Sequence, residues 1–434
     1  MLLIANGTII DPGTGFEGKE DLLIGDDGKI VGHAPYGELT ADRILDASGC
    51  IVAPGLVDTH SHFRDPGFTY KEDLHTGSLA AAAGGYTTVI LMANTKPPVD
   101  SVETLTDILS RGKKEAIHIY SAANVTRGMS GRKVNDLEAL AHAGASVFTD
   151  DGKPILDEAV FRAALEKANS LGIPVSLHEE DPQYIRENGI NAGSKAALSL
   201  HITGSDRMAE ISMVERDTRI AEELGARLLI QHISTKEGVD LVRRARARNP
   251  RIHAEATPQH FSLTEDAVLT TGSLAKVNPP LRTEEDRLAI IHGLQDGTID
   301  IIATDHAPHS TEEKSVTPLW KAPSGMIGLE TALSLSIQKL VEPGYLAMMD
   351  MLALLTCNPA DYYRLPAGTL APGACADIVI FDPAARRTIT KDSFHSKSHN
   401  SPFIGEELPG AVRCTLASGR IIYQDNSFGG ISKK

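Results

Sequence analysis

The stretch VDTHSHFRDPG, residues 57–67, places two histidines, His60 and His62, one residue apart at the end of an apolar run. Arg64 occupies the next alternate position. Because side chains alternate along a strand, the two imidazoles are predicted to share one face. Imidazoles arranged in this way are typical ligands of a first-row transition metal.

Other polar side chains also follow apolar runs. They are the pair Asp150 and Asp151, then His178, His232 and Asp305. Imidazole and carboxylate groups suit zinc, and the absence of a thiol among them argues against a structural zinc site. Copper, nickel, manganese and cobalt remain alternatives. The residue types therefore predict a shared site for one or two metal ions.

The predicted chemistry follows from these ligands. Zinc lowers the pKa of bound water to about 7, and a metal ion also polarises a carbonyl group. A carboxylate beside the water can take its proton and pass it to a leaving nitrogen, and Asp305 is the candidate for this role. We therefore expect hydrolysis of an amide-like bond, or the reverse condensation.

The segment ASVFTDD requires a choice between Asp150 and Asp151. Phe148 shares a face with Asp150, and its bulk suits the layer of helices, so we predict that Asp151 points toward the metals. Two other aspartates, Asp58 and Asp65, are interpreted as turn or capping residues. Several histidines lie off the pattern and are interpreted as structural or surface residues: His75, His118, His142, His201, His253 and His292.

The elements that must position these residues alternate along the chain. Between residues 57 and 358, eight apolar strand-like runs are separated by amphipathic helical stretches. This alternation predicts an α/β fold with a (β/α)8 barrel over residues 55–365, whose active site lies at the carboxyl ends of the strands. Both chain ends are rich in short strands, so residues 1–54 and 366–434 are predicted to pair as one small β-sandwich domain.

Composition limits the partners. The net charge is −15 and no basic cluster occurs, which argues against nucleic acid or an anionic membrane as partner. The four cysteines are scattered, the first residues do not resemble a signal peptide, and no apolar stretch approaches the ~20 residues of a membrane span. We expect a cytoplasmic protein with free thiols that acts on a small molecule.

Several motifs together resemble those of the dihydroorotases of the amidohydrolase superfamily, in their long-chain bacterial (class I) form. They are VDTHSHFRDPG, GGYTTVILMANTKPPVD, FTDDG, SLHEED, IQHIST, VNPPLR and IATDHAPHS, and the later GTLAPGACADIVIFDP resembles the superfamily's C-terminal β segment. The resemblance implies the reversible cyclisation of N-carbamoyl-L-aspartate to L-dihydroorotate in pyrimidine (UMP) biosynthesis.

The resemblance also implies a set of site residues. Two zinc ions per subunit would be held by His60, His62, Asp305, His178 and His232, with Asp151 and a hydroxide between them and the hydroxide as nucleophile. Asp305 would be the catalytic general acid and base. The implied substrate-binding residues are His62, Arg64, Asn94, Asn278, His309, Ser324 and Gly325.

Two positions depart from the family pattern. Ser324 replaces an aromatic residue that relatives often carry, which is expected to loosen the wall around the pyrimidine ring. Ala93 precedes Asn94 where proline is common, and little effect is expected.

Two alternatives stay open. One is another cyclic amidase of allantoinase or hydantoinase type, although those relatives usually bridge their metals with a modified lysine. The other is a non-catalytic homologue that acts as partner of a transcarbamoylase. We expect a homodimer, with association with an aspartate transcarbamoylase as a further candidate interaction.

Overall fold

Eight parallel strands form a barrel in the computed structural model, which describes residues 1–433. Neighbouring strands pair in chain order, and a parallel bridge between Ser61 and His306 joins the two ends of the series. The strands are β7 (Leu56–Ser61), β8 (Tyr86–Leu91), β9 (His118–Ala123), β10 (Val147–Phe148), β11 (Val175–Leu177), β12 (Leu228–Ile230), β13 (Ile252–Ala256) and β14 (Ile301–Ile302). The predicted α/β fold with a (β/α)8 barrel is confirmed.

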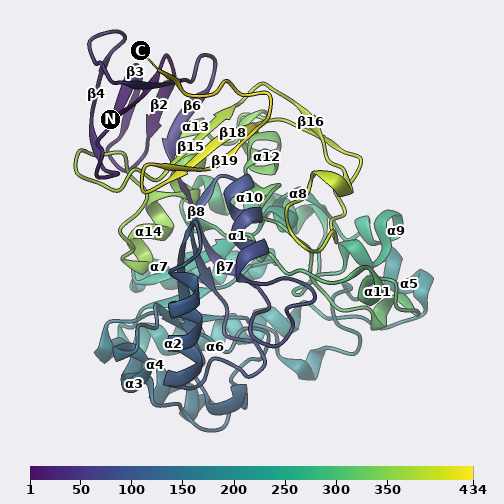
Figure 1. Cartoon of the computed structure of the whole chain (residues 1–434). Helices are drawn as coiled ribbons and strands as arrows, with labels where there is room; N and C mark the ends of the chain where they lie inside the picture. The colour runs from purple at the N-terminus through teal and green to yellow at the C-terminus, as the bar shows by residue number, and fades with distance from the viewer. Residues whose placement is uncertain (434) are drawn as a thin grey trace.

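Helices cover the outside of the barrel (Figure 1). The longer ones are α1 (Leu74–Ala83), α2 (Val102–Gly112), α4 (Glu158–Leu171), α6 (Met208–Leu224), α7 (Lys236–Arg248), α10 (Glu284–Gln295) and α13 (Met348–Leu355). The shorter ones are α3 (Leu137–His142), α5 (Lys195–Leu200), α8 (Pro258–Ser262), α9 (Ala267–Thr271), α11 (Thr311–Lys314), α12 (Ala332–Ser336) and α14 (Cys357–Tyr363). Single turns are η1 (Arg127–Met129), η2 (Pro182–Tyr184), η3 (Gly272–Ala275), η4 (Leu319–Lys321), η5 (Ile337–Val341) and η6 (Lys391–Ser393).

Helix α4 illustrates why these stretches form helices. Asp157 precedes its first turn and accepts hydrogen bonds from two backbone N–H groups there, and Gly172 ends the helix in the left-handed conformation. Phe161, Ala164 and Leu165 recur at helical spacing and are buried. The apolar stripe thus fixes the helix to the barrel while the opposite face stays in water.

Strands from both chain ends form the sheet-rich part at the top of Figure 1, where both termini lie. Its strands, in order across the sheet, are β19 (Arg420–Gln424), β18 (Ala411–Ala417), β15 (Ile378–Asp382), β6 (Ile51–Pro54), β2 (Thr8–Asp11), β3 (Phe16–Ile24), β1 (Leu2–Ala5), β5 (Arg43–Asp46) and β20 (Ser432–Lys433), with β4 (Ile30–Pro35) beside β3. Strands β16 (Arg387–Thr388) and β17 (Glu407–Leu408) pair separately.

A separate hydrophobic core holds this sheet-rich part together. It joins Ile4 and Leu22, near one edge, to Ile378 and Leu416, near the other, so the two halves of the sheet fold over one another. The predicted association of the two chain ends is confirmed, with Lys434 outside the described residues. Because β6 ends at Pro54 and β7 begins at Leu56, this part adjoins the barrel directly.

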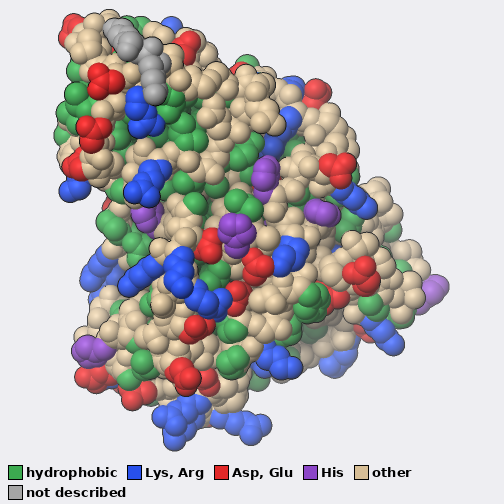
Figure 2. Space-filling view, in the orientation of Figure 1, with side chains coloured by type: hydrophobic (Ala, Val, Ile, Leu, Met, Phe, Trp, Pro, Cys, Tyr) green, Lys and Arg blue, Asp and Glu red, His purple; other side chains and the backbone are tan. Residues whose placement is uncertain are grey.

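The surface of the protein carries mixed charges. Figure 2 shows acidic and basic side chains interspersed over the visible face. Among the described residues, no helix is long and apolar enough to cross a membrane.

Candidate metal centre and active site

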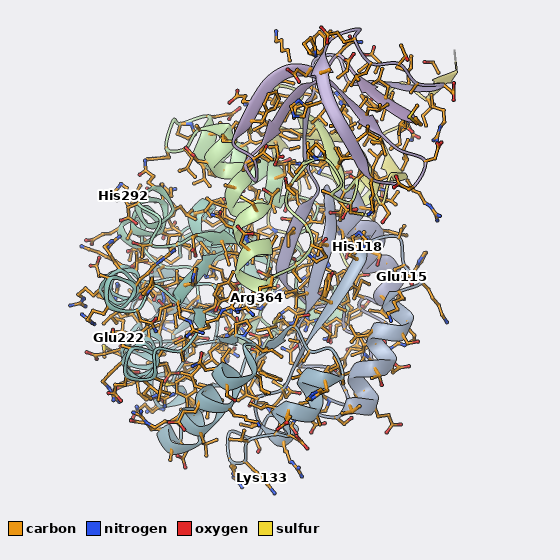
Figure 3. All side chains as sticks on the ribbon, turned by 90° about the vertical axis from the view of Figure 1, so that its left-hand side faces the viewer. Glu115, His118, Lys133, Glu222, His292 and Arg364 are labelled. Atoms are coloured by element: carbon orange, nitrogen blue, oxygen red, sulfur yellow. The ribbon has the colours of Figure 1, made fainter. Side chains whose placement is uncertain are left out.

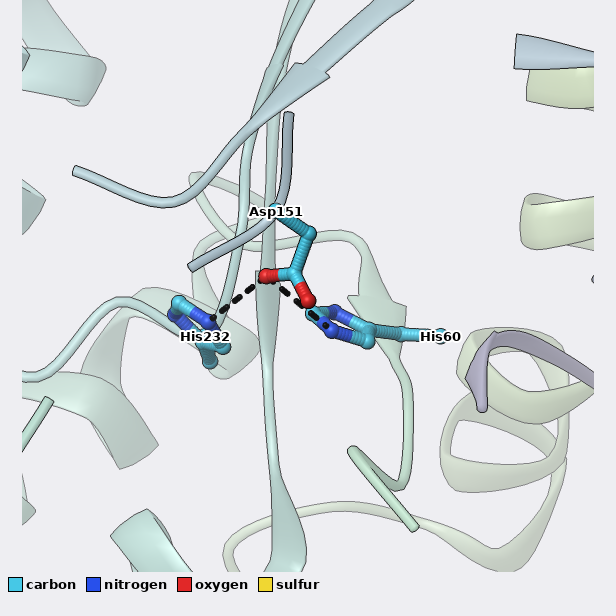
Figure 4. Close-up of side chains that lie close together, drawn as sticks. All are labelled: His60, Asp151 and His232. Carbon is cyan, nitrogen blue, oxygen red and sulfur yellow. Dashed lines mark ion pairs between the residues drawn. The ribbon is translucent and has the colours of Figure 1, made fainter. Parts of the chain in front are cut away.

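Four imidazoles converge on the carboxylate of Asp151 at the carboxyl ends of the barrel strands, and Figure 4 shows two of them, His60 and His232. Oδ1 of Asp151 lies 3.6 Å from Nε2 of His60, 3.8 Å from Nδ1 of His178 and 3.9 Å from Nε2 of His232. Its other oxygen lies 3.5 Å from Nε2 of His62. Asp151 is therefore the centre of the cluster.

Asp305 completes one side of the cluster. Its Oδ1 lies 3.0 Å from Nε2 of His62 and 3.6 Å from Nε2 of His60. On the other side, Nδ1 of His178 lies 3.0 Å from Nε2 of His232. The structure thus divides the histidines into two pairs, one beside Asp305 and one away from it, with Asp151 reaching both.

The orientation of three histidines leaves one lone pair of each facing this centre. The other ring nitrogen donates a hydrogen bond: His60 Nδ1 to Glu255 at 2.5 Å, His62 Nδ1 to Asn94 at 3.0 Å, and His178 Nε2 to Glu180 at 2.9 Å. Oxygen acceptors behind imidazoles fix the tautomer that a metal requires.

Unsatisfied polar atoms show that these residues fit metal ions. Nε2 of His60 is buried and has no hydrogen-bond partner among the described residues. A buried polar atom without a partner is costly, and a metal ion would satisfy it. Two groups, one of His60, Asp151 and His232 and one of His60, His62 and Asp305, each bring their ligand atoms within 4.8 Å of one another.

The carboxylates at the centre remain ionised. Burial would raise the pKa of Asp151, but His60 and His232 beside it hold that pKa well below its usual range. Burial would also raise the pKa of Asp305, but a hydrogen bond from His62 and the nearby imidazoles hold that pKa below its usual value. Both groups are therefore anions, as metal ligands must be.

Asp150, the neighbour of Asp151, points elsewhere. Its Oδ1 accepts a hydrogen bond from the backbone N–H of Thr126 at 3.2 Å, and its Oδ2 accepts one from the Thr126 hydroxyl. Of the two adjacent aspartates, the structure brings only Asp151 to the histidines.

A cavity of about 200 Å³ opens onto the histidine–aspartate cluster. This volume suits a molecule about the size of one substituted six-membered ring. Every residue assigned to substrate binding from the sequence lines the cavity: His62, Arg64, Asn94, Asn278, His309, Ser324 and Gly325. A larger cavity of about 1000 Å³ lies outside this site and contains none of these residues.

The guanidinium of Arg64 is the cationic end of the cavity. Its Nε donates to the Pro308 carbonyl at 3.2 Å, and its Nη2 lies 3.4 Å from Nε2 of His309. Burial and the charges of Arg64 and Lys71 hold the pKa of His309 far below its usual range. His309 is neutral, donating from Nε2 to the Ser324 carbonyl at 2.9 Å and accepting at Nδ1 from Lys71 at 3.2 Å.

The two asparagines have different environments. Asn94 accepts from His62 and donates to Asp151, to Oδ2 at 3.0 Å and to the backbone carbonyl at 3.4 Å, so it holds both ligands in place. Asn278 carries a buried side-chain oxygen without a hydrogen-bond partner among the described residues. Asn278 can therefore accept a hydrogen bond from a molecule in the cavity.

Ser324 and Gly325 form the part of the cavity wall beside His309. The Ser324 hydroxyl accepts from Nζ of Lys276 at 2.8 Å. Gly325 has φ +125°, and a Cβ added there would lie 2.7 Å from the Cβ of Ala307. Glycine is required at this position both for the backbone conformation and for the close approach.

Four residues that support the site were not identified from the sequence: Glu255, Glu180, Lys71 and Asp58. A charged residue inside an otherwise apolar strand, as in IHAEATP, was the available signal for Glu255. The interpretation of Asp58 as a turn or capping residue is wrong, because it lies inside β7 and accepts two hydrogen bonds from Thr304, at 2.9 and 2.6 Å. Burial raises its pKa to about 6.

Solved structures with the same fold include hydantoinases. An L-hydantoinase (dihydropyrimidinase) from Arthrobacter aurescens superposes with a TM-score of 0.88 at 24% identity, over 99% of this chain and 97% of that chain. A D-hydantoinase (dihydropyrimidinase) from a Thermus species gives a TM-score of 0.85 at 26% identity, with the same coverage.

Curated proteins found by sequence have higher sequence identity to this chain than these structures do. Residues 51–422 match the model of the amidohydrolase family. A dihydroorotase from Clostridium acetobutylicum is 50% identical over 425 residues, which are 98% of this chain and 100% of that protein. A dihydroorotase from Streptococcus thermophilus is 48% identical over 424 residues with the same coverage. The chain therefore belongs to the amidohydrolase family and, within it, to the dihydroorotases.

Proposed function

We propose that this enzyme interconverts N-carbamoyl-L-aspartate and L-dihydroorotate, a step of pyrimidine biosynthesis, with two zinc ions per subunit. One observation carries the proposal: a single small cavity joins the histidine–aspartate cluster to the guanidinium of Arg64. A cyclic amide that also bears a carboxylate needs both groups within one molecular length, since its ring must reach the metals while its carboxylate meets a cation.

The metal ligands follow from the two pairs of histidines. His60, His62 and Asp305 would hold one ion, His178 and His232 the other, and Asp151 would bridge them. Bound zinc would supply an acidified water and polarise the amide carbonyl. Among the described residues, no lysine lines this cavity, so no lysine is placed to bridge the metals after modification. This supports Asp151 as the bridging carboxylate.

Asp305 would move the proton. Its carboxylate is ionised and lines the cavity, so it can accept a proton from the attacking water and return it to the ring nitrogen as the amide bond breaks. In the direction of synthesis the same group takes the proton from the nitrogen of the carbamoyl group.

The remaining lining residues would position the substrate. Arg64 suits a carboxylate because its N–H groups can donate two parallel hydrogen bonds. Asn94, Asn278 and His309 lie beside it, and Ser324 and Gly325 would contact the ring. The short Ser324 side chain leaves more space beside the ring than an aromatic side chain would.

A hydantoinase-type cyclic amidase is the alternative, and the structural likeness to hydantoinases favours it. Neither hydantoin nor dihydrouracil has a carboxylate that would pair with Arg64. The half-buried guanidinium would then lack an anionic partner in the complex, which costs binding energy.

The proposal extends to location and assembly. Cys50, Cys357, Cys375 and Cys414 are free, as expected of a cytoplasmic protein. We further propose a homodimer, with an aspartate transcarbamoylase as a second interaction partner.

Purified zinc-loaded protein should be assayed side by side with dihydroorotate, dihydrouracil, hydantoin and allantoin. We expect turnover of dihydroorotate to exceed that of the other three by at least tenfold in kcat/KM. A preference for hydantoin or dihydrouracil would favour the alternative, and no turnover of any substrate by the zinc-loaded protein would favour a non-catalytic role.

A further inference from the structure

A second cluster of metal-binding side chains lies at the opposite end of the barrel, where β9 begins. His118 is the first residue of β9, and Figure 3 shows it just below the sheet-rich part. Its Nε2 lies 3.0 Å from Oδ2 of Asp377 and 3.1 Å from Oδ1. Sγ of Cys375 lies 3.5 Å from the same Oδ1, and all three residues have a ligand atom within 4.8 Å of the others.

These separations lie within a few tenths of an ångström of the edges of a metal coordination shell. Zinc binds imidazole nitrogen and carboxylate oxygen at about 2.0–2.2 Å and thiolate sulfur at about 2.3 Å. In a tetrahedron, such bonds place neighbouring ligand atoms about 3.3–3.6 Å apart. The side chains would therefore need to shift only by a few tenths of an ångström to accept an ion.

The backbone around the cluster is firmly held. His118 pairs with Thr88 in the barrel sheet, and Cys375 forms an antiparallel bridge with Lys29. Asp377 immediately precedes β15, and its Oδ1 accepts a hydrogen bond of 2.8 Å from the backbone N–H of Ser418. The three ligands come from segments with fixed positions, which lowers the entropic cost of binding an ion.

Two cavities give access to the cluster. A cavity of about 420 Å³ is lined by His118, Cys375 and Asp377, and His118 also lines the larger cavity of about 1000 Å³. Within residues 1–433, the ion pair with His118 is the only one that Asp377 makes. An ion could enter from either cavity, and a water molecule could complete its coordination.

We propose that His118, Cys375 and Asp377 bind one transition-metal ion of the zinc class, separate from the metal centre of the active site. The ion would join the barrel, through His118, to the segment that enters the sheet-rich part, through Cys375 and Asp377. The ion would crosslink the barrel and the sheet-rich part and so stabilise their association. This structural role does not depend on the proposed substrate.

Cobalt gives a specific readout because its thiolate complexes absorb through charge transfer in the near ultraviolet. The ligands of the active-site cluster are imidazoles and carboxylates, so cobalt bound there produces no such band. Chelator-treated, reduced protein should be titrated with Co²⁺ while this band is followed. We expect it to appear in the wild type and to saturate at an amplitude that corresponds to one thiolate–cobalt site per chain.

Three variants assign the band. Cys375→Ser and His118→Gln should lose it and should bind one fewer cobalt ion per chain, as measured by metal analysis after desalting. Cys357→Ser is the matched control, since Cys357 is also a partly exposed free cysteine but lies outside the cluster, and it should keep the band. The metal should raise the unfolding temperature of the wild type more than that of Cys375→Ser.

Two results would overturn the inference. One is the absence of the thiolate–cobalt band from folded wild-type protein at saturating Co²⁺. The other is a band that persists in Cys375→Ser or disappears in Cys357→Ser. The titration of the wild type alone shows whether the thiolate–cobalt band exists, so a variant that fails to fold leaves the test intact. Activity with dihydroorotate is not measured, so failure of this inference is distinguishable from failure of the proposed function.

Discussion

Glu255 offers a sharp test of how the metal centre is built. Its Oε1 accepts a hydrogen bond of 2.5 Å from Nδ1 of His60, and both side chains are fully buried. Burial opposes protonation of His60, but Glu255 and Asp151 hold its pKa well above the usual value. Glu255→Gln keeps the size of the side chain and an oxygen acceptor, and it removes the charge that makes His60 a strong ligand.

The expected magnitude follows from the position of Glu255 behind a single ligand. Removing such a partner typically lowers metal affinity by about 10- to 100-fold, which corresponds to roughly 1.4–2.7 kcal/mol. Because Glu255 touches only one of the four imidazoles by a side-chain hydrogen bond, the ion beside Asp305 should weaken most. We expect the second ion, between His178 and His232, to change by a smaller factor.

The measurement is a zinc titration of chelator-treated protein against a competing chelating dye, with wild type and variant in parallel. Glu20→Gln is the matched control, because Glu20 makes an equivalent 2.5 Å contact with His33 in the sheet-rich part, far from the metals. Unchanged zinc affinity in folded Glu255→Gln, or an equal loss in Glu20→Gln, would refute the reasoning.

Four further substitutions and one zinc reconstitution test the proposed roles. Asp305→Asn should lower kcat by roughly 10²–10⁴-fold at saturating zinc, and a variant above a tenth of the wild-type rate would contradict the proton-transfer role. Arg64→Met should raise KM for dihydroorotate by roughly 10- to 150-fold but change that for dihydrouracil little, whereas equal losses would indicate a structural role. Metal analysis should find one zinc ion per chain in Asp151→Ala and two in Asp150→Ala. The apo wild-type protein should recover full activity when zinc alone is added in bicarbonate-free buffer, and a dependence on bicarbonate would contradict the aspartate bridge.

Much of the fold could be predicted because hydrophobic patterning determines it. Eight apolar runs became eight parallel strands, and the polar residues after them met at one end of the barrel. The positions of His60, His178 and His232 in the sequence were sufficient for this, since parallel strands bring their carboxyl ends together. The choice between Asp150 and Asp151 required the alternation of side chains and the assignment of bulky Phe148 to the layer of helices.

Contacts between distant segments could not be predicted in this way. Glu255 lies 195 residues from His60, and Lys71 lies 238 residues from His309. Neither pair has a local spacing that identifies it, because the match arises only when the barrel closes. The same holds for Asp58, because its partner Thr304 lies 246 residues away and no local pattern identifies the contact.

The charge of the metal centre explains why these distant carboxylates are present. Asp151 and Asp305 face the centre, and Glu255 and Glu180 lie behind its imidazoles, so four carboxylates are buried within one small region. Uncompensated buried charge is costly, and neutral imidazoles do not compensate it. The pKa of His60 is raised well above its usual value because its carboxylate neighbours favour a cation there. A proton and a metal ion therefore compete for the same negative charge, and the carboxylates that orient the ligands also give the site its preference for cations.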